Sequence, residues 1–278
     1  MWQLEFRGVS LDYASVEGAS AHALADVSFG VAQGESLAII GPSGCGKTSL
    51  LHLAAGLRAP TQGSVLVDGR ELAGPSQSTA LILQDFGLLP WKSVRANAEL
   101  GLKLRGVGRA ERRERAREAL ALVGLSGFEG RYPGELSGGM CQRLALARSL
   151  ALDVSLLLMD EPLSALDALL REQLQDTLLA LWAARGYAQV LVTHSIQEAV
   201  YLGRRIIVFS GRPGSVRACV DNPQAGSPGY RGSDAYFAQV NALRALLAGG
   251  SGQADAPVAA SEQAAACASG VGEGGAHA

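Results

Sequence analysis

The sequence predicts an α/β fold in which strands and helices alternate around a parallel sheet. Two observations carry this prediction. Short apolar runs, typical of strands buried on both faces, are separated by segments with helical spacing, and a glycine-rich loop joins the first run to a predicted helix. Strands that alternate with helices pair in parallel, so these runs are expected to form one sheet. The runs are Ser36–Ile40, Leu156–Met159, Val190–Thr193 and Arg205–Phe209.

Size and charge limit the classes of protein to which this chain can belong. The 278 residues correspond to one large domain or two small ones. Apolar residues make up 48%, which is enough for a sizeable core and excludes collagen, coiled-coil rods and fully disordered chains. The 24 basic and 26 acidic residues give a net charge of −2, which argues against binding nucleic acid through bulk positive charge.

Cysteine spacing and hydropathy exclude further classes. The cysteines are far apart and form no CxxC pair, so neither a disulfide framework nor a zinc site is expected; they are Cys45, Cys141, Cys219 and Cys267. The first residues contain charges and no apolar segment of the signal-peptide kind. No apolar window of about 18 uncharged residues is present, so a membrane role would require a partner.

The N-terminal elements follow in order. Residues 2–13 and 27–40 indicate β-strands with turns between them, and Thr48–Gly56 has helical composition. Ser64–Val67 predicts another strand that ends at a hairpin turn, and Leu81–Gln84 predicts a short apolar strand.

The C-terminal half is mainly helical between its strands. A helical region is expected from Trp91 to about Leu150, with helices also over Gln173–Ala184 and Ala235–Leu247. After Pro213 the pattern weakens. From Gly249 the chain is mostly Ala, Gly, Ser and Gln and is expected to be disordered.

Arginine is concentrated in Arg105–Glu118, which admits two interpretations. The segment is either a nucleic-acid contact or the solvated face of a helix. Glutamates are interleaved with the arginines, and Glu111 stands four residues before Arg115, a spacing that allows an ion pair on one helix face. The solvated face is therefore the favoured interpretation.

Residues 41–48, Gly-Pro-Ser-Gly-Cys-Gly-Lys-Thr, fit the phosphate-loop pattern GxxxxGK[ST] at every fixed position. The loop follows a predicted strand and opens a predicted helix. Its glycines allow backbone N–H groups to face phosphate oxygens, and the helix N-terminus adds partial positive charge. Lys47 is expected to reach the β- and γ-phosphates, and Thr48 to supply a hydroxyl to Mg²⁺.

Two further motifs suit nucleotide chemistry. Asp160 and Glu161 end an apolar strand at the carboxyl edge of the predicted sheet, where ligands of such sheets bind. Asp160 would hold Mg²⁺, and Glu161 would polarise the attacking water. Ser137-Gly138-Gly139 precedes the helix predicted over Cys141–Leu150, which suits either an anion-binding helix N-terminus or an ordinary loop.

The order of these motifs resembles the nucleotide-binding subunit of ABC transporters over about residues 2–217. The matching segments are the phosphate loop, LSGGM at 136–140, LLLMDE at 156–161, SALD at 164–167, and the single residues Gln84 and His194. The sequence resembles the importer subunits for nitrate, sulfonate or taurine more closely still. This second likeness rests on FGLLPWKSVRANAELGL at 86–102, ALDALLREQLQ at 165–175, EAVYL at 198–202 and the turn Arg212-Pro213-Gly214.

The resemblance implies a P-loop NTPase fold with a RecA-like core, an antiparallel β subdomain and an inserted α-helical subdomain. The nucleotide-binding domain would span residues 1–220, with the helical subdomain at about 87–150. Residues 221–248 would form a C-terminal extension with one helix, and 249–278 a disordered tail.

The resemblance also assigns residue roles. Tyr13 would stack on adenine, although Ser15–His22 resembles a small insertion and Tyr13 also suits a core strand. Catalytic roles fall to Lys47, Gln84, Glu161 and His194, and Mg²⁺ binding to Thr48, Gln84 and Asp160. Asp167 would cross a dimer interface. The nucleotide-binding set is Tyr13, Gly41, Pro42, Ser43, Gly44, Cys45, Gly46, Lys47, Thr48, Ser49, Gln84, Ser137, Gly138, Gly139 and Asp167.

The implied function is an ATP-binding and ATP-hydrolysing importer subunit that energises uptake of a small anion such as nitrate, taurine or an alkanesulfonate. Two copies would bind ATP head to tail on the cytoplasmic face of the inner membrane. The expected partners are a membrane permease, contacted through Phe86–Trp91 unless that run is a buried loop, and through the permease an extracytoplasmic substrate-binding protein. No nucleic acid is expected.

Two alternatives remain open. A soluble ABC-type ATPase would act on ribosomes, DNA or a cofactor assembly, but the chain has one cassette and no room for a long coiled coil between Lys47 and Ser137. A small-molecule kinase would leave the Ser-Gly-Gly motif unexplained. Departures from the family pattern are Met140, Cys141, Leu163 and Ser195, and none removes a catalytic group.

Overall fold

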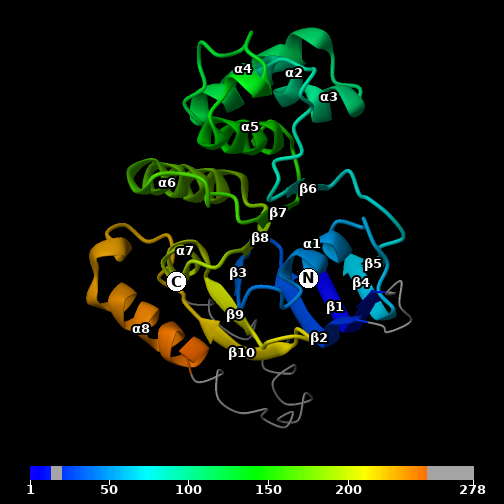
Figure 1. Cartoon of the computed structure of the whole chain (residues 1–278), viewed down its shortest axis with the longest axis vertical. Coiled ribbons are helices and arrows are strands. Elements are labelled where there is room, and N and C mark those ends of the chain that lie inside the picture. Colours follow the sequence, from blue (N-terminus) through cyan, green and yellow to red (C-terminus); the bar gives the residue numbers. More distant parts are fainter. Residues whose placement is uncertain (14–20, 249–278) are drawn as a thin grey trace, which may run out of the picture.

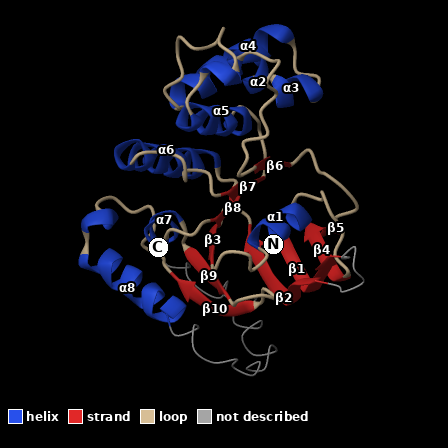
Figure 2. Ribbon diagram, in the orientation of Figure 1, coloured by secondary structure: helices blue, strands red, loops and turns tan. Residues whose placement is uncertain are grey.

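A computed structural model describes residues 1–13 and 21–248 (Figures 1 and 2). The tail from Gly249, and all but the last two residues of the insertion expected at Ser15–His22, lie outside the described residues. The described chain has two sheets, and a group of helices stands apart from them at the top of Figure 1.

The larger sheet has the strand order β10-β9-β3-β8-β7-β6. Pairing is parallel from β9 to β6, and β10 joins β9 antiparallel. Every residue of β3, β7, β8 and β9 is buried, which explains why these strands are continuous apolar runs in the sequence. The strands are β3 (Ser36–Ile40), β6 (Thr79–Ile82), β7 (Leu156–Asp160), β8 (Ala188–Val192), β9 (Arg205–Phe209) and β10 (Val216–Asp221).

The smaller sheet is antiparallel, with the order β2-β1-β4-β5. It consists of β1 (Trp2–Tyr13), β2 (Ala21–Ala32), β4 (Gln62–Val67) and β5 (Arg70–Glu71). Its buried side chains share one core with α1 and the central strands, in which Phe6 stacks on Phe29 with ring centroids 4.8 Å apart.

The differences from the sequence expectation include two strand boundaries and one additional strand. β2 begins at Ala21, before the predicted 27, and β6 ends at Ile82, so Gln84 lies in the following loop. β10 was not expected. Its residues are half-buried along most of its length and form no continuous apolar run; its only signal is a short alternation of Val216, Ala218 and Val220 with Arg217, Cys219 and Asp221.

The helices are α1 (Lys47–Ala54), α2 (Val94–Ala98), α3 (Leu100–Leu104), α4 (Arg109–Leu122), α5 (Gly138–Leu150), α6 (Ala168–Arg185), α7 (Ile196–Leu202) and α8 (Asp234–Ala248). In Figure 1, α2 to α5 lie at the top of the molecule, α6 lies directly below this group, and α7 and α8 lie lower still. Short 3₁₀ turns cover Pro133–Glu135 and Tyr230–Gly232.

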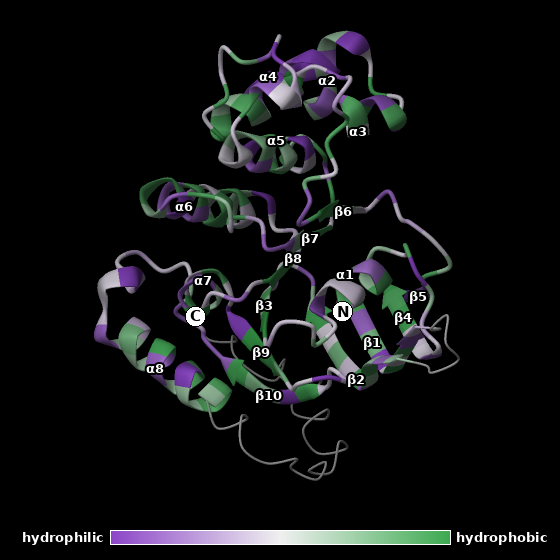
Figure 3. Cartoon of the chain, viewed as in Figure 1, coloured by the Kyte–Doolittle hydropathy of each residue, from purple (hydrophilic) through white to green (hydrophobic). Residues whose placement is uncertain are grey.

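Helix α4 contains ion pairs of the kind expected from its interleaved arginines and glutamates. Arg115 pairs with Glu111 at 3.4 Å, and Arg117 pairs with Glu114. Only Ala116, Ala119 and Leu120 of this helix are buried, and Figure 3 shows many hydrophilic residues along it. The buried residues join α5 and α2 in a second hydrophobic core.

Candidate functional site

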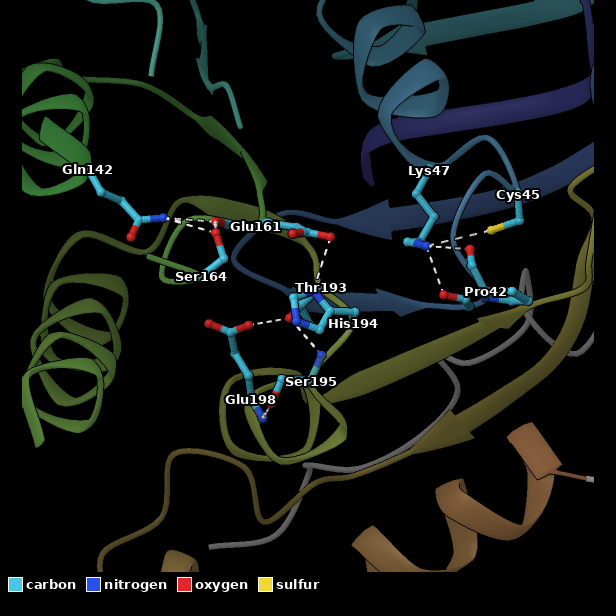
Figure 4. A network of polar contacts seen from close by, with 11 residues as sticks. Pro42, Cys45, Lys47, Gln142, Glu161, Ser164, Thr193, His194, Ser195 and Glu198 are labelled. Carbon is cyan, nitrogen blue, oxygen red and sulfur yellow. Dashed lines mark hydrogen bonds and ion pairs between the residues drawn. The ribbon is translucent and has the colours of Figure 1, made fainter. Parts of the chain in front are cut away.

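The glycine-rich loop connects β3 to α1 and curls tightly against β2. Gly46 has φ +94°, a conformation that favours glycine, and a Cβ atom there would lie 2.7 Å from the carbonyl oxygen of Ala23. The Nζ atom of Lys47 donates hydrogen bonds to the carbonyl oxygens of Gly41 and Pro42, both at 2.8 Å (Figure 4). Lys47 is 8% exposed, so its charge is held at the loop rather than in solvent.

A cavity of about 340 Å³ opens beside this loop. Its lining comes from both sheets, from α1 and from the loops after β6, β7 and β9. The lining residues are Tyr13, Ala23, Ser43, Gly44, Gly46, Lys47, Thr48, Ser49, Gln84, Asp160, Glu161, Val192 and Arg212. The carboxyl edge of the parallel sheet therefore meets the phosphate loop in one concave site.

Asp160 ends β7 at the base of this cavity and is 3% exposed. Burial raises the pKa of its carboxyl, opposed by a hydrogen bond with the Thr48 side chain, while the nearby Glu161 charge raises the pKa further. Thr48, Asp160 and Gln84 all line the cavity and carry hydroxyl, carboxylate and amide oxygens, the donor types that Mg²⁺ prefers.

The described residues contain no cluster of three or more His, Cys, Asp or Glu side chains able to hold a metal by themselves. This is consistent with Mg²⁺ chemistry, because Mg²⁺ is usually held by one or two carboxylates together with substrate phosphates. The oxygen donors of Thr48, Asp160 and Gln84 are of the types that suit Mg²⁺ bound together with substrate phosphates.

We expect Asp160→Asn to raise the melting temperature of the nucleotide-free protein by a few degrees at pH 7. Because the folded-state pKa of Asp160 is raised, its ionisation costs stability as pH rises through the interval between the ordinary and the raised pKa. Asparagine removes that charge and keeps an oxygen for Thr48. Thermal unfolding at several pH values, with the exposed Asp221→Asn as control, measures the effect. A lower melting temperature than wild type at pH 7 would contradict it.

Glu161 and His194 meet where β7 and β8 end. The Nδ1 atom of His194 lies 3.1 Å from Oε1 of Glu161 (Figure 4). Glu161 lines the cavity, whereas His194 does not; the His194 side chain is 63% exposed and the Glu161 side chain 20%. Glu161 adopts φ +47°, a left-handed conformation that is uncommon for a residue with a Cβ atom.

Tyr13 ends β1 and lines the same cavity. Its hydroxyl lies 2.8 Å from Oγ of Ser49 in α1, and the Arg58 guanidinium sits over the ring at 4.5 Å from the centroid. The Tyr13 side chain also packs against the adjoining core, so this residue borders both the cavity and the core.

Ser137, Gly138, Gly139 and Asp167 do not line this cavity. Ser137 caps α5 by accepting a hydrogen bond from the Met140 N–H at 3.3 Å, and Asp167 caps α6 by accepting one from the Leu170 N–H at 3.0 Å. Ser137, Gly138 and Asp167 are not buried, and Gly138 and Asp167 lie at the starts of their helices. Of the predicted nucleotide-binding residues, these four therefore lie outside both the phosphate loop and the lining of the cavity.

Arg212 lines the cavity, although the sequence suggested no role for it beyond the family turn. The turn is fixed by Gly214, where a Cβ atom would lie 1.9 Å from the carbonyl oxygen of Cys45, and by the Gly214 N–H, which donates to Ala23 at 2.9 Å. Glycine after Arg-Pro at the end of a buried strand was the available signal. The turn brings the positively charged Arg212 side chain to the same cavity as the phosphate loop.

A family model described as ABC transporter matches residues 24–164 of this chain, about half of its length. The chain belongs to the ABC transporter family. Taurine import ATP-binding protein TauB of Burkholderia pseudomallei (strain 1710b) is 50% identical over 210 residues, which cover 76% of this chain and 80% of that protein. The uncharacterized ABC transporter ATP-binding protein MJ0412 of Methanocaldococcus jannaschii is 47% identical over 198 residues, covering 71% and 74%.

Solved structures of ABC cassettes share the fold. A dimeric structure of a post-hydrolysis state of the ATP-binding cassette MJ0796, bound to ADP and Pi, matches with a TM-score of 0.73 and 32% identity, covering 78% of this chain and 98% of that chain. The P-loop NTPase fold predicted from the sequence is confirmed, and this member of the ABC family is an ATPase. Of the helices in the described part of the chain, none is long and apolar enough to span a bilayer.

Proposed function

We propose that this chain is the ATP-hydrolysing subunit of an ABC importer that takes up taurine or a related small anion. The observation that carries the proposal is the cavity that brings together Lys47, the Thr48–Asp160 pair and Glu161, whose carboxylate lies 3.1 Å from His194. The similarity to taurine import proteins supports the direction of transport and the class of cargo.

ATP would bind with its phosphates in the curl of the phosphate loop. Lys47 would exchange the carbonyls of Gly41 and Pro42 for phosphate oxygens, so its donors stay satisfied in both states. The loop residues Gly41–Ser49 would supply N–H and hydroxyl groups. Tyr13 would stack on the adenine, with Arg58 against its other face.

Hydrolysis would depend on groups at the carboxyl edge of the sheet. Thr48, Asp160 and Gln84 would hold Mg²⁺, which neutralises charge that develops on the phosphate oxygens. Glu161 would take the proton of the attacking water, and His194, 3.1 Å from the Glu161 carboxylate, would contact the γ-phosphate and orient that carboxylate.

A second copy of the chain would complete each site. The group formed by Ser137, Gly138, Gly139 and Asp167 is separate from the cavity, and none of these four residues is buried. A head-to-tail dimer would place the N-terminus of α5 of one chain over the nucleotide of the other, where its N–H groups can bind phosphate. The dimeric state of the similar MJ0796 cassette supports this arrangement.

The membrane partner would contact the loop after Gln84. Trp91 in this loop is 71% exposed, while Phe86 and Leu88 pack partly against the helical core. The segment therefore combines an anchored base with an exposed aromatic side chain, which suits a permease contact on the cytoplasmic face of the membrane. An extracytoplasmic substrate-binding protein would deliver the cargo to that permease.

Affinity capture of the tagged chain from detergent-solubilised native membranes tests the membrane partner. Mass spectrometry is expected to find a multi-span membrane protein, joined after cross-linking by an extracytoplasmic binding protein whose ligand can then be measured. The variant Trp91→Ser should recover less of the membrane protein, and the exposed Leu104→Ser in α3 serves as control. Recovery of soluble partners alone would favour the soluble ABC-type ATPase instead.

A further inference from the structure

Gln142 lies in the second turn of α5 and is 2% exposed. Its Nε2 donates to the carbonyl oxygen of Glu161 at 3.0 Å and to Oγ of Ser164 at 3.4 Å (Figure 4). Its Oε1 accepts from the N–H of Ala165 at 3.0 Å. The Glu161 carbonyl needs an N–H donor and the Ala165 N–H needs an oxygen acceptor, and the glutamine amide supplies both in one buried group.

The partner of this amide is the strained backbone of Glu161. Its left-handed φ of +47° is unfavourable for a residue with a Cβ atom and persists only where neighbouring contacts hold it. The Glu161 N–H donates to Val192 at 2.9 Å, and the Glu161 carbonyl accepts from Gln142 and from the Ser164 hydroxyl at 3.0 Å. These contacts fix the peptide planes on both sides of the residue that carries the carboxylate.

The same amide ties this segment to the helix that begins at Gly138. Gly139 of α5 packs closely against the segment that follows β7, since a Cβ atom on Gly139 would lie 3.3 Å from Cδ2 of Leu166. Ala165, which donates to Gln142, belongs to the segment that leads to Asp167. The N-terminal turns of α5 and residues 161–166 therefore form one packed unit with a polar link through Gln142.

We propose that Gln142 is a positioning residue for ATP hydrolysis, which holds the Glu161 backbone in its left-handed conformation and couples it to α5. The inference rests on the proposed role of Glu161 as general base. Gln142 does not line the nucleotide cavity, so it acts through Glu161 and not on ATP. ATP binding is therefore independent of this amide, whereas the rate of hydrolysis depends on it.

The substitution Gln142→Glu tests the donor specifically. Glutamate keeps the shape and an acceptor for the Ala165 N–H but places a second oxygen against the Glu161 carbonyl. Misplacement of a reacting group by a fraction of an ångström is expected to lower kcat by about tenfold or more. The affinity for ATP should stay within roughly threefold of wild type, since no phosphate contact changes.

Gln3→Glu is the matched control. Gln3 is 4% exposed and donates to Asp68 at 2.6 Å and Ser155 at 2.9 Å, and none of these residues lines the nucleotide cavity. It likewise loses the two hydrogen bonds that the amide donates, and it also faces the Asp68 carboxylate, so it should lower the melting temperature while kcat of the folded protein is unchanged. Gln142→Met removes both ends of the amide without burying a charge, and it provides the kcat measurement if the glutamate variant does not fold.

The double variant Gln142→Glu with Glu161→Gln separates positioning from general destabilisation. Residues that act as one unit are not additive, so the double variant should hydrolyse ATP within about twofold of Glu161→Gln alone. A full additional tenfold loss would overturn the positioning role, as would a kcat for both Gln142 variants equal to that of Gln3→Glu. Normal turnover of Glu161→Gln itself would instead show that Glu161 is not the general base, and the inference, which rests on that role, would then be wrong as well.

Discussion

Replacing Glu161 with glutamine is expected to slow ATP hydrolysis by at least about a hundredfold, the lower end of what general-base catalysis contributes. Glutamine keeps the shape of the side chain and an oxygen that faces His194, but its amide cannot accept the proton of the attacking water. ATP binding should persist, because Lys47 and the phosphate loop are unchanged. The dimer that closes around ATP should therefore accumulate.

Two measurements check this result together. Steady-state phosphate release gives the turnover, and light scattering with and without ATP gives the dimer. Glu172→Gln on the surface of α6, where Glu172 pairs with Arg231 at 3.2 Å, is a suitable control because it makes the same chemical change outside the cavity. Turnover of Glu161→Gln within about threefold of wild type would assign the proton to another group.

Much of the catalytic core could be predicted from sequence because its strands are buried on both faces. Continuous apolar runs identify β3, β7, β8 and β9, and the residues that follow such strands meet at one sheet edge by geometry alone. The position of Asp160 and Glu161 beside the phosphate loop therefore follows from the sequence pattern, and the shared cavity confirms it.

Positions set by packing between distant segments could not be predicted in this way. β10 is half-buried along most of its length and has no continuous apolar run, so its short alternation of apolar and other residues was too weak a signal to predict a strand. Arg212 reaches the cavity because Gly214 fits against the Cys45 carbonyl, and Gln142 meets Glu161 because α5 packs on the segment after β7. Neither contact leaves a pattern in the local sequence. Side chains that tune a site from neighbouring elements are visible only in the fold.

Replacing Lys47 with alanine is expected to weaken ATP binding by about a hundredfold or more. In the proposed complex Lys47 would contact two phosphates, and each charge-assisted hydrogen bond contributes about 1.5–3 kcal/mol, so losing two would amount to at least two powers of ten in affinity. Arg212 lines the same cavity but is exposed, so solvent screens its charge and it cannot replace the buried ammonium group.

The nucleotide-free loop must be considered in the same experiment. Without Lys47, the Gly41 and Pro42 carbonyls lose the donor that they contact at 2.8 Å, and the loop can rearrange. Lys47→Met fills much of the same volume without the charge. If both variants lose affinity equally in titrations with a fluorescent ATP analogue, the charge is the cause, whereas recovery in the methionine variant would make loop packing the cause. Lys103 in α3 is exposed, so Lys103→Ala is the control. Unchanged ATP affinity in both Lys47 variants would show that Lys47 does not bind phosphate.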